Sequence, residues 1–283
     1  MTSPAPTRRP SFTAALAAVA DRRAGDYRED EWGFDPEFAE AALPFFELAY
    51  ERWWRVRAEG VENIPARGRA MLVANHAGVL PFDAAMMSTA IRLLHPEPRW
   101  PRFMVLDWAF ELPYLSYFVR RVGGVPANPY NATRLLEQDH VVMAFPEGVK
   151  GTGKAYSDRY RLQRFGRGGF VEVALRTRSP IIPVAVVGSE EIYPKIAESR
   201  TLARLLRAPF VPITPTFPLL GPLGLVPLPS RWRIEFGPPI DLSEFPAEAA
   251  EDRSLILELS ERVRDTIQRS LYDNLLERGG AFL

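Results

Sequence analysis

The sequence predicts an α/β fold: a single domain built on a largely parallel central sheet that is flanked by helices. Short apolar runs of the kind found in strands alternate along the chain with longer segments whose apolar residues recur at helical spacing. Such alternation is typical of parallel sheets, because the chain needs a crossover between successive parallel strands. No linker or repeat divides the 283 residues. We therefore expect one domain over residues 31–283, preceded by a flexible, polar tail over residues 1–30.

The first expected element is an amphipathic helix over residues 38–54. Its apolar residues, among them Phe38 and Phe45, recur at helical spacing up to the pair Trp53-Trp54. The pattern has two interpretations. The helix either packs against the core or lies at a bilayer interface, where tryptophan is favoured.

Six strands and five further helices are expected to follow. The strands are expected at Arg55–Glu59, Ala70–Ala74, Arg102–Leu106, Val141–Phe145, Ile181–Val187 and Arg231–Phe236. The helices are expected at residues 82–94, 113–121, 130–138, 167–178 and 248–277. In the last helix an apolar residue recurs every four positions from Leu255 to Leu275, so this helix should pack one stripe onto the sheet.

The segment 208–230 differs from the rest of the domain. It has no charged residue and carries a proline every few positions, so it cannot form a continuous helix that spans a membrane. It is either an apolar loop folded back over the core, or a hydrophobic surface that enters lipid or covers an acyl-chain pocket. The arginines beside it would suit anionic headgroups; they are Arg204, Arg207, Arg231 and Arg233.

Composition excludes several classes of protein. Lys and Arg together number 35, as do Asp and Glu, so the chain lacks the basic excess of a nucleic-acid binder. It has no cysteine, which excludes disulfides, thiolate nucleophiles and cysteine metal sites. Neither an export signal nor an apolar span of about 20 residues is evident. We expect a cytoplasmic protein that lies on the inner face of a membrane, peripheral or monotopic, without crossing it.

His76 and Asp83 are the candidates for catalysis. His76 and the preceding Asn75 follow an expected strand, and Asp83 stands at the start of the next expected helix. A carboxylate in this position can fix the imidazole tautomer and stabilise the imidazolium that forms when histidine removes a proton from a hydroxyl. Of the other histidines, His95 is expected at the surface and His140 as a structural residue.

Further blocks extend this motif. Together, and in this order, the blocks resemble those of the glycerolipid acyltransferases over about residues 55–240. They are Asn75-His76…Asp83, Gly123-Gly124-Val125-Pro126, Phe145-Pro146-Glu147-Gly148 and Ile182-Pro183-Val184.

The resemblance implies a fold like that of glycerol-3-phosphate acyltransferase and an acyltransferase domain over residues 31–283. It implies that His76 is the general base and Asp83 its orienting partner, while Glu147 and Gly148 shape the acceptor site and the Pro183 strand helps to line the acyl pocket. The residues expected to bind substrate are Asn75, Gly78, Phe145, Pro146, Glu147, Gly148, Lys150 and Pro183.

The implied reaction moves a fatty acyl group from acyl-CoA or acyl-ACP, as co-substrate, to a hydroxyl of a glycerol-based lipid at a membrane surface. No covalent acyl-enzyme is expected, because the chain has no cysteine and no serine in a nucleophile motif. Asn75 or nearby backbone N–H groups would stabilise the oxyanion. Neither a metal, a further cofactor nor a nucleic-acid partner is expected.

Two departures from the family's pattern bear on the acceptor. Six residues separate His76 from Asp83 where the commonest spacing is four, and members resembling the mono- and diacylglycerol acyltransferases have a longer turn here. Lys150 stands where phosphatidate-forming members carry an arginine, and a lysine lacks the bidentate fork of a guanidinium. We expect a lysophospholipid or lysophosphatidate as acceptor. The alternatives are a neutral mono- or diacylglycerol, or a lipid-binding homologue that has lost catalysis.

A phosphate-loop pattern overlaps the third block. Gly148 to Lys154 match G-x-x-x-x-G-K, but Ala155 offers no hydroxyl to a magnesium ion, so nucleotide chemistry is not expected. Lys150 and Lys154 would instead meet the phosphates of coenzyme A. Arginines 161, 164 and 167 either form a solvated face or help a helix N-terminus to hold an anion.

Overall fold

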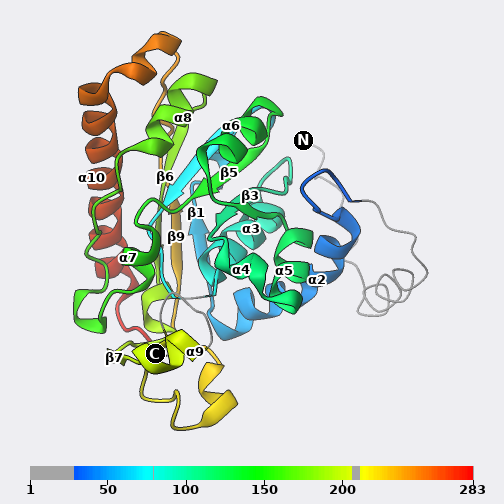
Figure 1. Ribbon diagram of the computed structural model, residues 1–283, viewed down its shortest axis with the longest axis vertical. Coiled ribbons are helices and arrows are strands. Elements are labelled where there is room, and N and C mark those ends of the chain that lie inside the picture. Colours follow the sequence, from blue (N-terminus) through cyan, green and yellow to red (C-terminus); the bar gives the residue numbers. More distant parts are fainter. Residues whose placement is uncertain (1–28, 79, 206–210, 283) are drawn as a thin grey trace.

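Seven strands form one sheet in the order β1-β9-β6-β2-β5-β3-β4 (Figure 1). The structure is a computed structural model, and it describes residues 29–78, 80–205 and 211–282. The strands are β1 Arg57–Glu59, β2 Ala70–Ala74, β3 Arg102–Val105, β4 Gly124–Pro126, β5 Val141–Ala144, β6 Ile181–Val187 and β9 Arg233–Phe236. Strands β6, β2, β5, β3 and β4 run parallel, whereas β9 pairs antiparallel with β6. The predicted α/β fold with a largely parallel sheet is therefore confirmed.

The long helices lie close to their expected positions. They are α2 Pro36–Leu48, α3 Phe82–Leu94, α5 Pro113–Arg121, α6 Pro129–Glu137, α8 Gly169–Thr177 and α10 Arg253–Arg278. The expected helix 38–54 begins earlier, because Asp35 caps it, and ends as a π-helical turn at Ala49–Trp53. The expected helix 248–277 is shorter at its start, because Asp252 caps α10 and a separate 3₁₀ turn precedes it at Ala247–Glu251.

Several short elements have no counterpart among the expected ones. They are α4 Trp108–Glu111, α7 Gly148–Thr152, α9 Arg200–Leu205 and the two-stranded sheet of β7 Ala197–Glu198 and β8 Pro212–Ile213. Strand β4 was also not predicted, because Gly124 and Pro126 are poor strand formers. Proline is tolerated there because β4 lies at an edge of the sheet.

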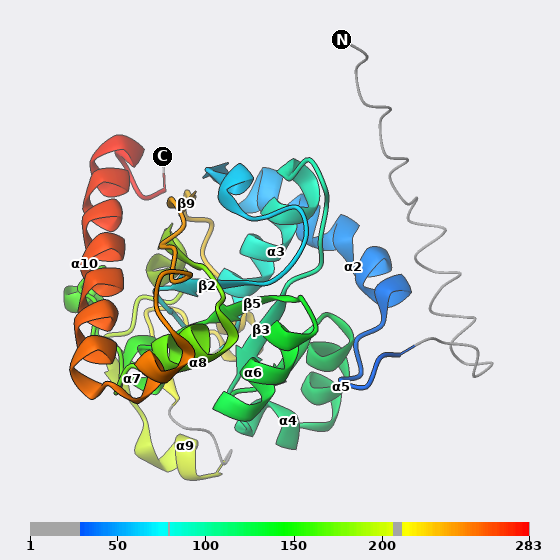
Figure 2. The same cartoon turned by 90° about the horizontal axis from the view of Figure 1, so that it is seen from above.

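Helices cover both faces of the sheet and form two apolar cores. Helices α2 and α3 lie on one face, and α6, α8 and α10 lie on the other (Figure 2). Strand β2 shows the division residue by residue: Leu72 contributes to the first core, and Met71 and Val73 to the second. Because side chains alternate along a strand, an apolar run such as β2 is buried on both faces.

The start of the domain is held by ion pairs. Most of the expected tail, residues 1–28, lies outside the described residues. Its last two residues, Glu29 and Asp30, pair with Arg121 at the end of α5 and with Arg102 in β3. The contacts of the domain therefore begin before residue 31.

The Pro-rich segment adjoins the end of the π-helical turn. Three consecutive side chains, those of Trp53, Trp54 and Arg55, donate hydrogen bonds to the carbonyl oxygens of residues 227–229. Each of these bonds joins residues 174 positions apart in the sequence. The first and last quarters of the chain thus meet beside β1 and β9. Residues 208–210 of the expected insertion lie outside the described part of the chain.

Candidate active site

The carboxyl ends of three neighbouring parallel strands carry most of the candidate residues. Strand β2 leads into Asn75-His76, β5 leads into Phe145-Pro146-Glu147, and β6 leads into Gly188-Ser189-Glu190. Since β2 lies between β5 and β6, all three turns meet at one edge of the sheet. This is the edge at which ligands bind in open α/β sheets.

His76 and Asp83 form a hydrogen-bonded pair. Asp83 is fully buried in the first turn of α3, and its Oδ2 lies 2.6 Å from Nδ1 of His76. The same oxygen accepts from the backbone N–H of Ala77, and Oδ1 accepts from that of Ala84. A carboxylate that accepts at every contact favours a proton on Nδ1, which leaves the lone pair on Nε2. The six-residue spacing therefore returns the carboxylate to the imidazole.

The imidazole of His76 is held in place but remains accessible. Its ring stacks on that of Phe145, with ring centroids 4.6 Å apart. The side chain of His76 is 17% exposed. Within the described residues, no group makes a hydrogen bond with Nε2. This nitrogen is therefore free to accept a proton from a ligand.

Glu147 holds the His76 turn through a hydrogen bond to its backbone. Its side chain is fully buried; Oε1 accepts from the backbone N–H of His76 at 3.1 Å, and Oε2 accepts from that of Gln163 at 2.7 Å. Lys154 Nζ lies 3.2 Å from Oε2. The carboxylate is thus committed to the protein's own donors, and the expected role of Glu147 in shaping the acceptor site stays a prediction.

Asn75 and Pro183 also differ from expectation. Asn75 is buried, and both polar atoms of its side chain bond to the backbone of Val186, so it ties β2 to β6 and is not placed to stabilise an oxyanion. Pro183 lies within β6 and is paired with Val73. It forms no part of the cavity wall described below. Its carbonyl accepts from Gly237, so the missing N–H falls on the side where β9 has just ended.

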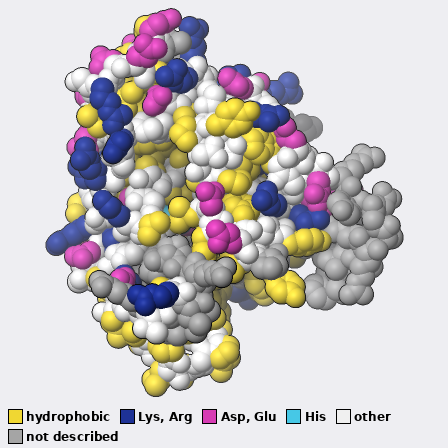
Figure 3. Space-filling view, viewed as in Figure 1, with side chains coloured by type: hydrophobic (Ala, Val, Ile, Leu, Met, Phe, Trp, Pro, Cys, Tyr) yellow, Lys and Arg dark blue, Asp and Glu magenta, His cyan; other side chains and the backbone are white. Residues whose placement is uncertain are grey.

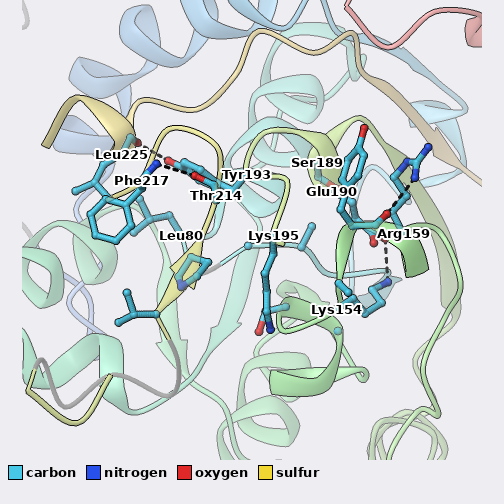
Figure 4. A pocket seen from close by; sticks show the side chains of 18 of the residues that line it. Leu80, Lys154, Arg159, Ser189, Glu190, Tyr193, Lys195, Thr214, Phe217 and Leu225 are labelled. Carbon is cyan, nitrogen blue, oxygen red and sulfur yellow. Dashed lines mark hydrogen bonds and ion pairs between the residues drawn. The ribbon is translucent and has the colours of Figure 1, made fainter. Parts of the chain in front are cut away.

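A cavity of about 460 Å³ opens beside the His76 turn. Ala77 and Gly78 line it, and Gly78 is the only one of the expected substrate-binding residues in the wall within the described chain. Leu80, Phe217 and Leu225 lie toward one end, and Lys154, Arg159 and Glu190 toward the other (Figure 4). The cavity thus has an apolar and a charged end, as an amphipathic ligand requires.

Part of the Pro-rich segment covers this cavity. Val211, Pro212, Thr214, Phe217 and Leu225 all belong to its wall. Tyr193 connects the segment to the turn after β6, since its hydroxyl donates to the carbonyl of Leu225 at 2.6 Å. Residues 211–225 therefore cover a pocket, which is one of the uses considered above for residues 208–230.

The lysines of the phosphate-loop pattern point to different places. Lys154 is buried between Glu147 and Glu190 and also lines the cavity, so its charge is already paired within the protein, and a contact with coenzyme A phosphates stays a prediction. Lys150 is exposed on α7 and lines a shallow depression next to the cavity.

Gly148 takes a positive φ where α7 begins, and Pro146 only leads into this turn. Arginines 161, 164 and 167 are exposed, as a solvated face would be.

His95 is buried, contrary to expectation. Its Nε2 lies 2.8 Å from the carbonyl oxygen of Ile64, and its Nδ1 accepts from the backbone N–H of Glu97. The imidazole thereby fastens the loop after α3 to the turn before β2. The prolines around His95 correctly predicted a loop, but they gave no sign that the imidazole would be buried.

Glu190 was not predicted as a site residue. It follows β6 closely, as His76 follows β2, and this shared position at the ends of parallel strands was the available signal. Burial raises the pKa of Glu190 from its usual 4.5 to about 7, although Lys154 acts in the opposite direction. Glu147 raises the pKa further, and a hydrogen bond from the backbone of Tyr160 lowers it.

Glu190 should make the protein less stable as the pH rises. Between pH 4.5 and about 7 the folded protein retains a proton that the unfolded chain has released. The free energy of unfolding should therefore fall across this window, by on the order of 3 kcal/mol. Urea unfolding of wild type and Glu190→Gln at several pH values measures the effect. We expect the variant to lack this part of the fall; the same pH dependence in both proteins would contradict the prediction.

The fold and the site together define an acyltransferase. A family model described as Acyltransferase matches residues 55–187. An uncharacterised protein of Mycobacterium leprae is 50% identical over 272 residues, covering 94% of this chain and 74% of the relative. A protein of Bos taurus named "DGAT1/2-independent enzyme synthesizing storage lipids" is 25% identical over 219 residues, covering 76% of this chain and 59% of the relative.

The fold has a counterpart among solved structures. The 1-acyl-sn-glycerophosphate acyltransferase PlsC from Thermotoga maritima aligns with a TM-score of 0.60 at 18% identity, covering 95% of this chain and 92% of that one. The chain therefore belongs with the acyltransferases, and it shares its fold with that enzyme.

Proposed function

We propose that this protein transfers a fatty acyl group from a thioester, acyl-CoA or acyl-ACP, to a hydroxyl of a glycerol-based lipid. The observation that carries the proposal is the His76–Asp83 pair beside a cavity with an apolar and a charged end. A histidine whose Nδ1 is held by a buried carboxylate can accept a proton at Nε2.

The proposed reaction proceeds without a covalent enzyme intermediate. Nε2 of His76 takes the proton of the acceptor hydroxyl while its oxygen attacks the thioester carbonyl. The tetrahedral intermediate collapses, the carbon–sulfur bond breaks, and the thiolate leaves with the proton held by the imidazolium. Asp83 stabilises that imidazolium throughout. The products are an ester and a free thiol, so the atoms balance without any further reactant.

Two classes of acceptor are candidates. A lysophospholipid or lysophosphatidate follows from the motifs. A neutral mono- or diacylglycerol is favoured by Lys154, because its charge is already neutralised by Glu147 and Glu190 and offers little to a phosphate group. The name of the bovine relative, which refers to storage lipids, supports the neutral class.

An acceptor screen tests the proposed function. Wild-type protein is incubated with radiolabelled acyl-CoA and, separately, lysophosphatidate, a lysophospholipid, monoacylglycerol or diacylglycerol, and the lipid products are separated. We expect label in one acylated lipid. Tight binding of these lipids with no transfer from acyl-CoA or acyl-ACP would instead favour the lipid-binding alternative.

We further propose that exposed apolar side chains bind this protein to a membrane surface. Within the Pro-rich segment, Leu219 is 83% exposed and Leu223 is 73% exposed. Hydrophobic side chains gather at the lower end of the molecule in Figure 3, over this segment. Phe45 and Leu48 of α2 are exposed as well, and Trp53 connects α2 to the segment through its bond to Pro227. In the described chain, no helix is long and apolar enough to cross a bilayer.

Leu219→Ser should weaken binding to phospholipid vesicles by roughly fivefold to tenfold, because one leucine side chain would no longer enter the apolar phase. Vesicle co-sedimentation at increasing lipid concentration measures the partition. Leu276→Ser is the matched control, since Leu276 is 84% exposed on α10. Equal partition of the two variants would count against this surface.

A further inference from the structure

Three charged side chains are buried together between the His76 turn and the cavity. Glu147, Lys154 and Glu190 have side-chain exposures of 0%, 4% and 5%. Lys154 Nζ lies 3.2 Å from Oε2 of Glu147 and 2.9 Å from Oε1 of Glu190 (Figure 4 shows the second contact). We call these residues the charge cluster.

A stable core does not require the charge cluster. Removing charges from water is unfavourable, and apolar side chains of similar volume usually stabilise a fold as well or better. The position of the cluster indicates a more specific use. One end contacts the backbone of His76 through Glu147, and the other end, Glu190, lines the cavity.

The packing around Glu147 leaves its carboxylate little freedom. Helix α7 approaches so closely that a Cβ atom on Gly151 would lie 2.6 Å from Cβ of Glu147. The contacts of the carboxylate are all with donors: the N–H of His76, the N–H of Gln163 and the ammonium of Lys154. This geometry also gives the glycine-rich Gly148–Lys154 sequence a role that has no connection with nucleotides.

We propose that Lys154 and Glu190 are positioning residues for His76, acting through Glu147. Lys154 keeps the Glu147 carboxylate aimed at the backbone of the His76 turn, and Glu190 balances the lysine from the cavity wall. The inference rests on the proposed function for its effect on catalysis, but the geometry that it assigns to the turn can be tested without any substrate.

Loss of the cation should disturb the turn. In Lys154→Met, two buried carboxylates would face each other without the ammonium that separates them. The two carboxylates must then share the proton that the raised pKa of Glu190 favours, or move apart, and in either case Oε2 of Glu147 is drawn away from the N–H of Gln163. In the double variant Lys154→Met/Glu190→Gln the excess charge is removed, so Glu147 can keep its two backbone donors.

Kinetics test the catalytic effect. We expect Lys154→Met to lower kcat at least about tenfold with KM within about threefold, and the double variant to regain at least about fivefold in kcat. Arg176→Met is the control, because it breaks a surface ion pair with Glu172 on α8. A folded Lys154→Met with wild-type kcat would overturn the proposal. So would a folded double variant without acyl transfer when wild type transfers.

NMR of the His76 backbone amide provides the second arm. Its proton resonance should move upfield in Lys154→Met, because its bond to a carboxylate weakens, and should return in the double variant. If wild type transfers no acyl group, the proposed function fails while this arm still tests the positioning. If Lys154→Met does not fold, the double variant decides: a wild-type-like amide shift supports the proposal, and a displaced one overturns it.

Discussion

Replacement of His76 by Asn is expected to lower kcat for acyl transfer by about 10³-fold, with KM for both substrates within about threefold. Asparagine can keep a hydrogen bond to Asp83 through its amide nitrogen, so the turn should survive. It has no basic nitrogen in the position of Nε2, so the acceptor hydroxyl must attack without losing its proton to the enzyme. The kinetic constants are measured with purified protein and the acceptor found in the screen.

His140→Asn is the matched control for this experiment. His140 precedes β5 at the amino end of the strand, whereas the site lies at the carboxyl ends. We expect its kcat to stay within about twofold of wild type. Transfer by His76→Asn at the wild-type rate would exclude His76 as the base, whatever the acceptor.

Asp83→Asn is expected to lower kcat by about 10²- to 10³-fold, because the imidazole loses the carboxylate that fixes its tautomer. The amide group must direct its nitrogen either at His76 Nδ1 or at the backbone N–H of Ala84, which is also a donor. The first orientation moves the imidazole proton to Nε2, the atom that has to accept. The second places two donors face to face.

Thermal unfolding and the kinetic constants together separate these effects from loss of the fold. Asp252→Asn is the control, because the Asp252 carboxylate accepts from backbone N–H groups at the start of α10 as that of Asp83 accepts from Ala84 in α3, but Asp252 is distant in the sequence and does not line the cavity. A folded Asp83→Asn with more than about half of the wild-type kcat would leave Asp83 with a purely structural role.

The sequence was sufficient for the pair but not for its surroundings. His76 and Asp83 are close in the chain, and the strand and helix that hold them have clear apolar patterns. Lys154 and Glu190 lie 36 positions apart. Their contact depends on the turn after β6 reaching the residues that follow α7, which no local pattern encodes. The same holds for the secondary structure: elements with a clear local pattern were predicted, and elements that depend on a distant partner were not.

Strand β4 illustrates the limit for the fold. Its Gly124 and Pro126 argue against a strand, and only pairing with β3 makes it one. By contrast, α3 was predicted at its observed bounds because its apolar positions repeat over three turns. For Glu147, the motif indicated a residue of the site correctly, but its hydrogen bonds to His76 and Gln163 could be seen only in the folded chain.

The bonds from Trp53, Trp54 and Arg55 to residues 227–229 have a consequence for synthesis of the protein. At about 5–20 residues per second, a ribosome needs roughly 9–35 s to add the 174 residues that separate the partners. During that interval the indole of Trp54, which ends 1% exposed, has no partner from the late segment. The nascent chain can place Phe82 against this ring early, but the indole N–H finds its acceptor only in the final quarter of the chain, so this junction is completed late in synthesis.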